Sequence, residues 1–287
     1  MLNFHLKEDW ESLSTLIIPV RNINKLVASK KPKIYISLTS NPLRLKNIPL
    51  MLSFLDLTHV YQIHINLPKY YRNKKKGVYS QKEIDYIKSL DSRIKVYRLD
   101  KDIGPITKIL PTLKRVRDNK AIIISLDDDV GYPRSIINEL IYFTYKNPKA
   151  IWGGEGFNFG DYQGSDFDKK KWPKGKTKNS VDILEGWASI AYPKWLITKD
   201  LIKRMEAGVK LSTDCKLSDD LVISETLAYY RIPRKVMHSK FYSQLPIPFA
   251  YGLGADALHQ GSGVGGAKSH NVMDENMAKY HRCLDRY

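Results

Sequence analysis

The chain has 287 residues and 43% of them are hydrophobic, which is enough for one large domain or two small ones with a buried core. The composition excludes a disordered or fibrous protein, and no apolar run approaches the roughly 20 residues that a membrane-spanning helix needs. The formal net charge of +17 fits a nucleic-acid or membrane-surface partner, or a phosphorylated substrate. It also fits solvated lysines, and we prefer this interpretation because lysine is spread along the chain. Local basic patches at 74–76 and 169–171 leave a weak contact with an acidic surface open.

The N-terminus lacks the basic start and apolar core of a secretory signal peptide, so we expect a cytoplasmic protein. Cys215 and Cys283 are the only cysteines, and one disulfide between them is formally possible. Because the signal is missing and cysteines are few, two free thiols in a reducing compartment are expected instead.

Strand-like and helix-like segments alternate from Lys33 onward. Strands are predicted at 33–40, 60–68, 93–99 and 121–126, and helices at 44–57, 80–90, 104–116 and 133–147. The segment 121–126 is almost purely β-branched and apolar, which is typical of a central parallel strand buried on both faces. This alternation predicts an α/β fold with a Rossmann-like, mostly parallel central sheet flanked by helices.

The second half of the chain is less regular. It predicts a long loop at 158–180, a strand at 181–193, and helices at 218–231 and 272–287. The glycine-rich segment 252–266 is a candidate mobile lid. We expect residues 1–32 to form an extension packed on a domain of residues 33–287, with a ligand-binding half at 33–150 and a second half at 151–287.

Three consecutive acids end the fourth predicted strand, in the sequence IIISLDDDVGYP. Asp127 and Asp129 are two residues apart and point to the same side, whereas Asp128 points elsewhere. Open α/β sheets bind ligands beyond the carboxyl ends of their strands, and two carboxylates there suit Mg²⁺ or Mn²⁺ with room for substrate phosphates. The alternative is an acidic turn that caps the next helix. One aspartate would be enough for a cap, so three favour the metal.

Two other functions fit part of this pattern. A haloacid-dehalogenase-like phosphohydrolase needs two aspartates two residues apart and then Thr or Val two residues further on, but Gly131 holds that last position. A basic module that binds nucleic acid or an acidic glycan would explain the net charge. It would leave the acidic cluster at the strand end unexplained.

Five motifs in order carry a family resemblance: ISLTSNPLR, DIGPITKILPTL, IIISLDDDVGYP, LEGWASIAYP and LSDDLVIS. From Lys33 to Arg231 the chain resembles family 2-like glycosyltransferases of glycosyltransferase A fold from bacteria and large DNA viruses. The resemblance implies a nucleoside-diphosphate sugar donor, usually UDP- or dTDP-linked, a divalent metal, and inverting transfer to a hydroxyl acceptor. The acceptor class stays open between a glycan, a protein and a small molecule, and a virus-encoded enzyme acting in a host cell also fits.

On the donor side, the resemblance implies nucleotide-sugar contacts from Ser37, Leu38, Thr39, Arg44, Asp102, Lys108, Asp127 and Asp128. Lys108 would meet the diphosphate as a point charge, and Gly104 would allow a close backbone approach. The same stretches fit an ordinary strand-to-helix turn, and a surface turn followed by a helix whose lysine faces solvent.

On the acceptor side, Glu185, Gly186 and Trp187 would form the sugar-binding wall, although a tryptophan is more often simply a core residue. Family 2-like enzymes place an acidic pair where this chain has Asp219 and Asp220. The resemblance implies that Asp220 is the general base and that Asp219 supports it or holds the acceptor. Two acids that complement a helix dipole are the alternative.

Glycosyltransferase A enzymes often use a late histidine as a third metal ligand. His259 and His270 are the candidates, and His270 is preferred because it lies between the glycine-rich segment and the last predicted helix. The implied metal site is therefore Asp127, Asp129 and His270.

Overall fold

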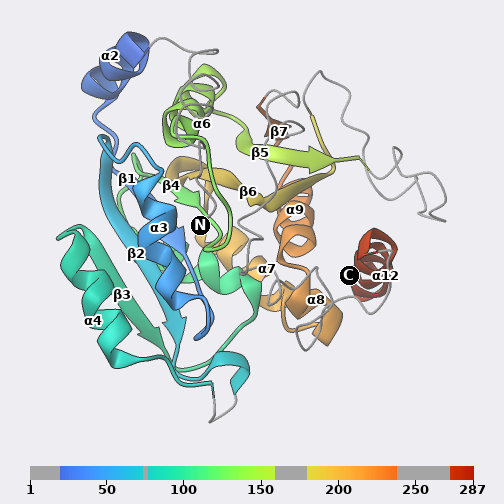
Figure 1. The fold of residues 1–287 in the computed structure, drawn as a ribbon. Helices are drawn as coiled ribbons and strands as arrows, with labels where there is room; N and C mark the ends of the chain where they lie inside the picture. The colour runs from blue at the N-terminus through green and yellow to red at the C-terminus, as the bar shows by residue number, and fades with distance from the viewer. Residues whose placement is uncertain (1–19, 74–76, 159–179, 238–271) are drawn as a thin grey trace.

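The computed structural model describes residues 20–73, 77–158, 180–237 and 272–287 (Figure 1). Within these residues, seven strands form one sheet: β1 (Ile34–Leu38), β2 (Val60–Pro68), β3 (Ile94–Leu99), β4 (Ile122–Ser125), β5 (Ile151–Phe157), β6 (Ile183–Pro193) and β7 (Arg234–Val236). The α-helices are α2 (Val20–Lys30), α3 (Ile48–Ser53), α4 (Gln81–Leu90), α5 (Leu110–Arg115), α6 (Ile136–Lys146), α7 (Lys199–Gly208), α8 (Thr213–Leu217), α9 (Asp219–Tyr229) and α12 (Val272–Leu284). Short 3₁₀ helices are η1 (Leu45–Asn47), η2 (Tyr71–Asn73), η3 (Pro105–Lys108) and η5 (Lys194–Leu196).

The strand order is β3-β2-β1-β4-β6-β5-β7. Strands β3, β2, β1 and β4 run parallel, β6 runs antiparallel to both β4 and β5, and β7 is parallel to β5. Helices flank this sheet, so the predicted α/β fold with a mostly parallel central sheet is confirmed (Figure 1). Because β1 and β4 are parallel neighbours, with Ser37 paired to Ser125, the loops that follow them leave the sheet at the same edge.

The core lies on both faces of the sheet because residues alternate along each strand. Ile34 and Ile36 of β1 face a cluster that includes α3, α4 and α6, whereas Tyr35 faces a second cluster that includes α5, α7 and α9. The apolar β4 sequence is fully buried, as its composition predicts. Helix α2 adds Ile23, which is 1% exposed.

Most predicted elements are present, with shorter helices. The helix predicted at 44–57 is split into η1 and α3, with Pro49 in the first turn of α3. The helix predicted at 104–116 is split into η3 and α5. Strands β5 and β7 and helices α7 and α8 were not predicted. The predicted lid at 252–266 lies outside the described residues, as do residues 1–19 and most of the loop 158–180.

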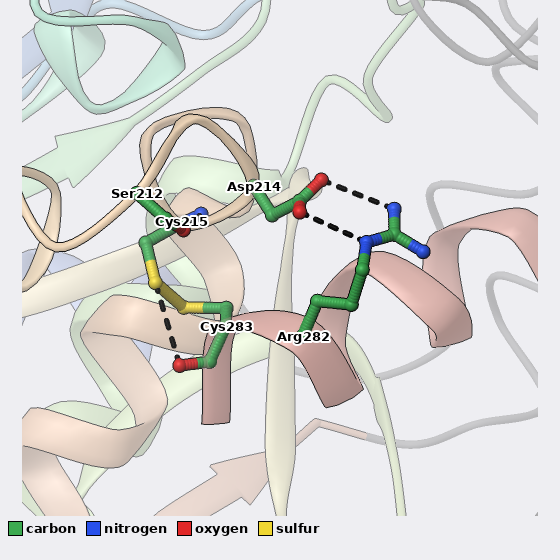
Figure 2. The surroundings of a disulfide bond; sticks show 5 residues. All are labelled: Ser212, Asp214, Cys215, Arg282 and Cys283. Atoms are coloured by element: carbon green, nitrogen blue, oxygen red, sulfur yellow. Dashed lines mark hydrogen bonds and ion pairs between the residues drawn. A yellow bond between two sulfur atoms is a disulfide. The ribbon is translucent and has the colours of Figure 1, made fainter. Parts of the chain in front are cut away.

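Cys215 and Cys283 form a disulfide, so the expectation of two free thiols is wrong (Figure 2). Helix α12 packs against α8 and brings the two Cα atoms within 4.9 Å, although the cysteines are 68 residues apart. Both side chains are fully buried. Disulfides are rare in cytosolic proteins, and a cytoplasmic location stays a prediction. No helix among the described residues is long and apolar enough to span a membrane.

Candidate active site

A cavity of about 530 Å³ opens beyond the carboxyl ends of the parallel strands. Its lining comes from segments far apart in sequence: the loop after β1, the turn before η3, the acids after β4, β6, and helices α8, α9 and α12. The predicted site residues that line it are Thr39, Arg44, Asp102, Lys108, Asp127, Asp128, Trp187, Asp219 and Asp220. The fold therefore brings together motifs that the sequence separates by up to about 180 residues.

Lys108 is the charge centre of the cavity. Its Nζ atom lies 3.1 Å from Asp127 Oδ1 and 3.3 Å from Asp219 Oδ2, and its side chain is 6% exposed. Burial lowers the pKa of Lys108, but the nearby carboxylates of Asp127, Asp219 and Asp220 outweigh this effect and raise it well above its usual value. Lys108 is therefore a fixed positive charge, suited to an anionic ligand and not to proton transfer.

Asp220 lies in the first turn of α9 and accepts a 2.9 Å hydrogen bond from the backbone N–H of Gly186 in β6. Burial raises the pKa of Asp220 well above its usual value, and the neighbouring Asp219 raises it further. Burial likewise raises the pKa of Asp219, against the opposing effect of Lys108. A carboxylate with a raised pKa, held in a cavity by one hydrogen bond, has the properties of a general base.

Gly186 is needed for this arrangement because Lys108 and Asp220 meet over its Cα atom. A Cβ atom at this position would lie 2.4 Å from Lys108 Nζ and 2.7 Å from Asp220 Oδ1. Any side chain here would displace at least one of the two charged groups. Gly186 therefore acts through its lack of a side chain, which fits the functional interpretation of the EGW motif.

Arg44 connects the loop after β1 to the acids after β4. Its guanidinium forms an ion pair with Asp128 at 2.9 Å and a second ion pair with Asp129. Asp128 is 2% exposed and also accepts a hydrogen bond from Ser40. Burial raises the pKa of Asp128 to about 7, with Arg44 acting in the opposite direction. The three acids are thus not equivalent: Asp127 pairs with Lys108, whereas Asp128 and Asp129 share Arg44.

The described residues contain no group of three or more histidine, cysteine or acidic side chains that could hold a metal ion. His259 and His270 lie outside the described residues. Asp127 nevertheless suits a hard divalent cation, because it offers carboxylate oxygens and lines the cavity with a 28% exposed side chain. Asp129 is not among the lining residues, and it pairs with Arg44 as Asp128 does, although the sequence spacing had grouped it with Asp127. Each now has a cationic partner, so a metal at Asp129 would replace Arg44.

Ser37 and Leu38 are not in the cavity lining, unlike the other predicted donor-side residues. Ser37 is fully buried, and its hydroxyl donates a hydrogen bond to the carbonyl oxygen of Lys108. Leu38 is a fully buried core residue because β1 has helices on both sides. Thr39, the next residue, lines the cavity and donates to the carbonyl oxygen of Asn66 at 2.7 Å.

Asp102 shapes the turn before η3. Its carboxylate accepts hydrogen bonds from the backbone N–H groups of Arg72 at 2.5 Å and Gly104 at 2.7 Å. Gly104 has a positive φ of 86°, and a Cβ there would lie 2.4 Å from the carbonyl oxygen of Lys216. The close approach to the Gly104 backbone was expected from a bound ligand. In the structure it is made by helix α8 of the protein.

Trp187 lines the cavity, and its carbonyl accepts a 2.7 Å hydrogen bond from Tyr132. Glu185 is not among the lining residues, and it is paired with Glu155 of the neighbouring strand β5. Burial and the charge of Glu155 raise the pKa of Glu185 to about 7.

Several lining residues were missed by sequence reasoning: Asn41, Tyr71, Arg72, Tyr79, Thr213, Lys216, Leu217, Ser218, Lys279 and Tyr280. Asn41, Leu217 and Ser218 lie within the quoted motifs and could have been found there. The others lie in segments with no local signal, and only the tertiary packing brings them to the cavity.

No protein-family model matches the chain, and no curated protein matches it. Among solved structures, the chain is similar to a mannosyltransferase from Pyrobaculum calidifontis in complex with GDP-Man and Mn²⁺, with 10% identity and a TM-score of 0.47. It is also similar to GalNAc-T7 with UDP, GalNAc and Mn²⁺ (13%, 0.49) and to the galactosyltransferase LgtC with donor and acceptor sugar analogues (10%, 0.48).

Each similarity covers 72% of this chain. The matched regions cover 55%, 42% and 74% of the three solved chains, so this chain spans about half the length of the first two. The function of the chain is therefore inferred from the chemistry of its own cavity.

Proposed function

We propose that the chain is a metal-dependent glycosyltransferase of glycosyltransferase A fold. It transfers a sugar from a nucleoside-diphosphate sugar, with UDP the expected nucleotide, to a hydroxyl acceptor. One observation carries this proposal: a buried lysine and four carboxylates, Asp127, Asp128, Asp219 and Asp220, converge in one cavity beyond the parallel strand ends. Such a cavity offers a cation for a leaving diphosphate and a base for an acceptor.

The donor enters between the loop after β1 and the turn before η3. Thr39, Arg44 and Asp102 line this side of the cavity and supply hydrogen-bonding groups for the nucleotide. Lys108 would contact the diphosphate, because its ammonium group is held charged at the cavity surface between Asp127 and Asp219. Its positive charge stabilises the negative charge that develops as the sugar leaves.

Asp220 would take the proton of the acceptor hydroxyl as its oxygen forms a bond to the anomeric carbon and the bond to the diphosphate breaks. Gly186 positions Asp220 by its backbone hydrogen bond. Attack from the face opposite the diphosphate gives inversion, and Trp187 offers an aromatic surface for a sugar ring nearby.

Asp127 and Asp129, with a third ligand such as His270, would hold the metal. A bound Mn²⁺ or Mg²⁺ supplies Lewis-acid neutralisation of the diphosphate. The carboxylates, including Asp127 close to the nucleotide side, suit this cation and make the cavity a poor site for the phosphate backbone of a nucleic acid.

The proposal is tested by calorimetric titration of a panel of nucleotide sugars with Mn²⁺, followed by donor hydrolysis and transfer assays. Asp220→Asn should keep donor binding and lose transfer by roughly 100-fold or more, since general bases contribute about this much. Asp127→Asn should weaken metal-dependent donor binding. Asp200→Asn, at a 74% exposed position on α7, is the matched control and should change neither. Wild-type transfer by Asp220→Asn would show that another group is the base.

A further inference from the structure

One side of the cavity is built from two helices that are distant in sequence. Helix α8 contributes Thr213, Lys216 and Leu217, and α12 contributes Lys279 and Tyr280. We call these five residues the α8–α12 wall. Apart from Leu217, which begins the LSDDLVIS motif, they lie outside the motifs that pointed to the active site, and the proposed mechanism does not use them.

A covalent bond holds the two halves of the wall together (Figure 2). Cys215 is the residue directly before Lys216, and Cys283 follows Lys279 by four residues and Tyr280 by three, so these side chains share one face of α12. Beside the disulfide, Arg282 donates two hydrogen bonds to Asp214, at 2.9 and 3.1 Å. The disulfide is therefore one residue from Lys216 along α8 and one helical turn from Lys279 along α12.

The wall is also fixed to the rest of the cavity at both of its ends. The carbonyl oxygen of Lys216 lies so close to Gly104 that no Cβ fits between them. At the other end, the ring of Tyr280 stacks on Phe157 of β5 with an interplanar angle of 6°. A displacement of α12 would consequently change the cavity between the donor-side turn and β5.

The charges of the wall suit an anionic ligand. Among the described lining residues, Arg44 pairs with Asp128, Lys108 pairs with Asp127 and Asp219, and the charge of Lys279 acts on Asp214. Besides Arg44 and Lys108, the cationic residues of the lining are Arg72, Lys216 and Lys279, and two of these three belong to the wall.

We infer that Lys216 and Lys279 bind the anionic diphosphate part of the substrate, and that the Cys215–Cys283 disulfide holds them in position to do so. This inference deepens the proposed glycosyl transfer and rests on it for the identity of the diphosphate ligand. The disulfide then has a role in substrate affinity in addition to its effect on stability. Reduction lowers the affinity because α12 loses its covalent link to α8.

The first experiment removes the wall charges from the full-length, oxidised protein. Lys216→Met and Lys279→Met are titrated calorimetrically with UDP and with inorganic diphosphate. Each variant should bind both ligands about fivefold to tenfold more weakly, as expected for the loss of one charge-assisted contact in a partly exposed site. Lys210→Met is the matched control, because Lys210 is exposed, precedes α8 and does not line the cavity. Its affinity and melting temperature should equal those of the wild type, and unchanged affinities in both wall variants would overturn the inference.

The second experiment compares the oxidised protein with protein reduced by dithiothreitol, well below the melting temperature of either form, with the thiols counted by alkylation and mass spectrometry. Reduction should weaken the binding of inorganic diphosphate and UDP by at least the factor seen for one wall lysine, while circular dichroism stays unchanged. The Cys215→Ser, Cys283→Ser double variant should bind as weakly as reduced protein and should not respond to dithiothreitol. Equal affinities in the two redox states would show that the disulfide serves stability alone and would overturn the inference.

The two proposals fail in different ways. If UDP-sugars bind equally well in both redox states, glycosyl transfer stands and the role of the disulfide fails. If inorganic diphosphate binds in a disulfide-dependent way but no nucleotide sugar binds, the wall stands and the proposed function fails.

Discussion

Gly186 and Asp220 meet across 34 residues of sequence, where the backbone N–H of the glycine donates a 2.9 Å hydrogen bond to the carboxylate. This contact fixes the first turn of α9 against β6 and orients Asp220 beside Lys108. The same point of contact has no room for a side chain.

Gly186→Ala should therefore lower kcat by at least about tenfold, with a smaller change in KM for the donor. The added methyl group would displace Lys108 Nζ or Asp220, and small displacements of catalytic groups carry large rate penalties. Steady-state kinetics with the donor identified by titration measure this effect. An unchanged kcat would contradict the role of this contact.

Lys108→Met should destabilise the protein by about 3–5 kcal/mol at pH 7, because it leaves the carboxylates of Asp127 and Asp219 in the cavity without their cation. The loss should be smaller at pH 5 than at pH 8, since burial raises the pKa of Asp219 and this carboxylate takes up a proton as the pH falls. Urea unfolding at the two pH values measures both effects. Lys114→Met is the matched control: Lys114 pairs with Glu206 but is 52% exposed, so its removal should cost no more than about 1 kcal/mol.

Glu185→Gln should stabilise the protein at pH 8 and have little effect at pH 5. Burial and Glu155 raise the pKa of Glu185 to about 7 in the folded state, above its usual value near 4.5. The folded protein therefore binds a proton that the unfolded chain releases, and this contribution to stability is lost as the pH rises through about 7. Between pH 5 and pH 8, the melting temperature of the variant should rise progressively above that of the wild type. Melting temperatures that differ by the same amount at every pH would contradict the raised pKa of Glu185.

Arg44→Met should raise the affinity for Mn²⁺ in the absence of a donor. Arg44 forms an ion pair with Asp129, and removing the guanidinium frees that carboxylate from its competitor. Titration followed by electron paramagnetic resonance of free Mn²⁺ measures the affinity. Asp129→Asn should lower it, and an unchanged affinity in Arg44→Met would show that Arg44 and the metal do not compete.

The parallel half of the sheet was predictable because its strands are short apolar runs separated by helical periodicity. The acids of 127–129 and 219–220 were predictable for a related reason, since charge next to a buried strand or a helix start is conspicuous. Strand β5 was missed because its sequence, IWGGEGF, contains three glycines, which are depleted in strands. The strand conformation of β5 is stabilised by its pairing with β6, because its own residues have a low strand propensity.

The disulfide and the wall were not predictable from local patterns. Thr213, Lys216 and Lys279 carry no motif, and their approach depends on packing between α8 and α12. The prediction that Ser37 lines the cavity was wrong for another reason. Its position at the strand end was correct, but its side chain points into the protein toward Lys108 and Thr112 instead of into the cavity. Sequence position located the edge of the sheet and left the side-chain direction open.

The buried hydroxyl of Ser37 helps to decide when the side chain of Lys108 becomes ordered. Ser37 holds the backbone of Lys108, and Asn66 donates to Thr112 at 3.0 Å and to Ser37 at 3.2 Å within the same buried network. At its other end, the lysine ammonium is held by two carboxylates. A free lysine side chain loses up to about 2 kcal/mol of rotamer entropy when it is immobilised. Here that entropy is lost while the chain folds, so a ligand that reaches Lys108 meets a group that is already ordered.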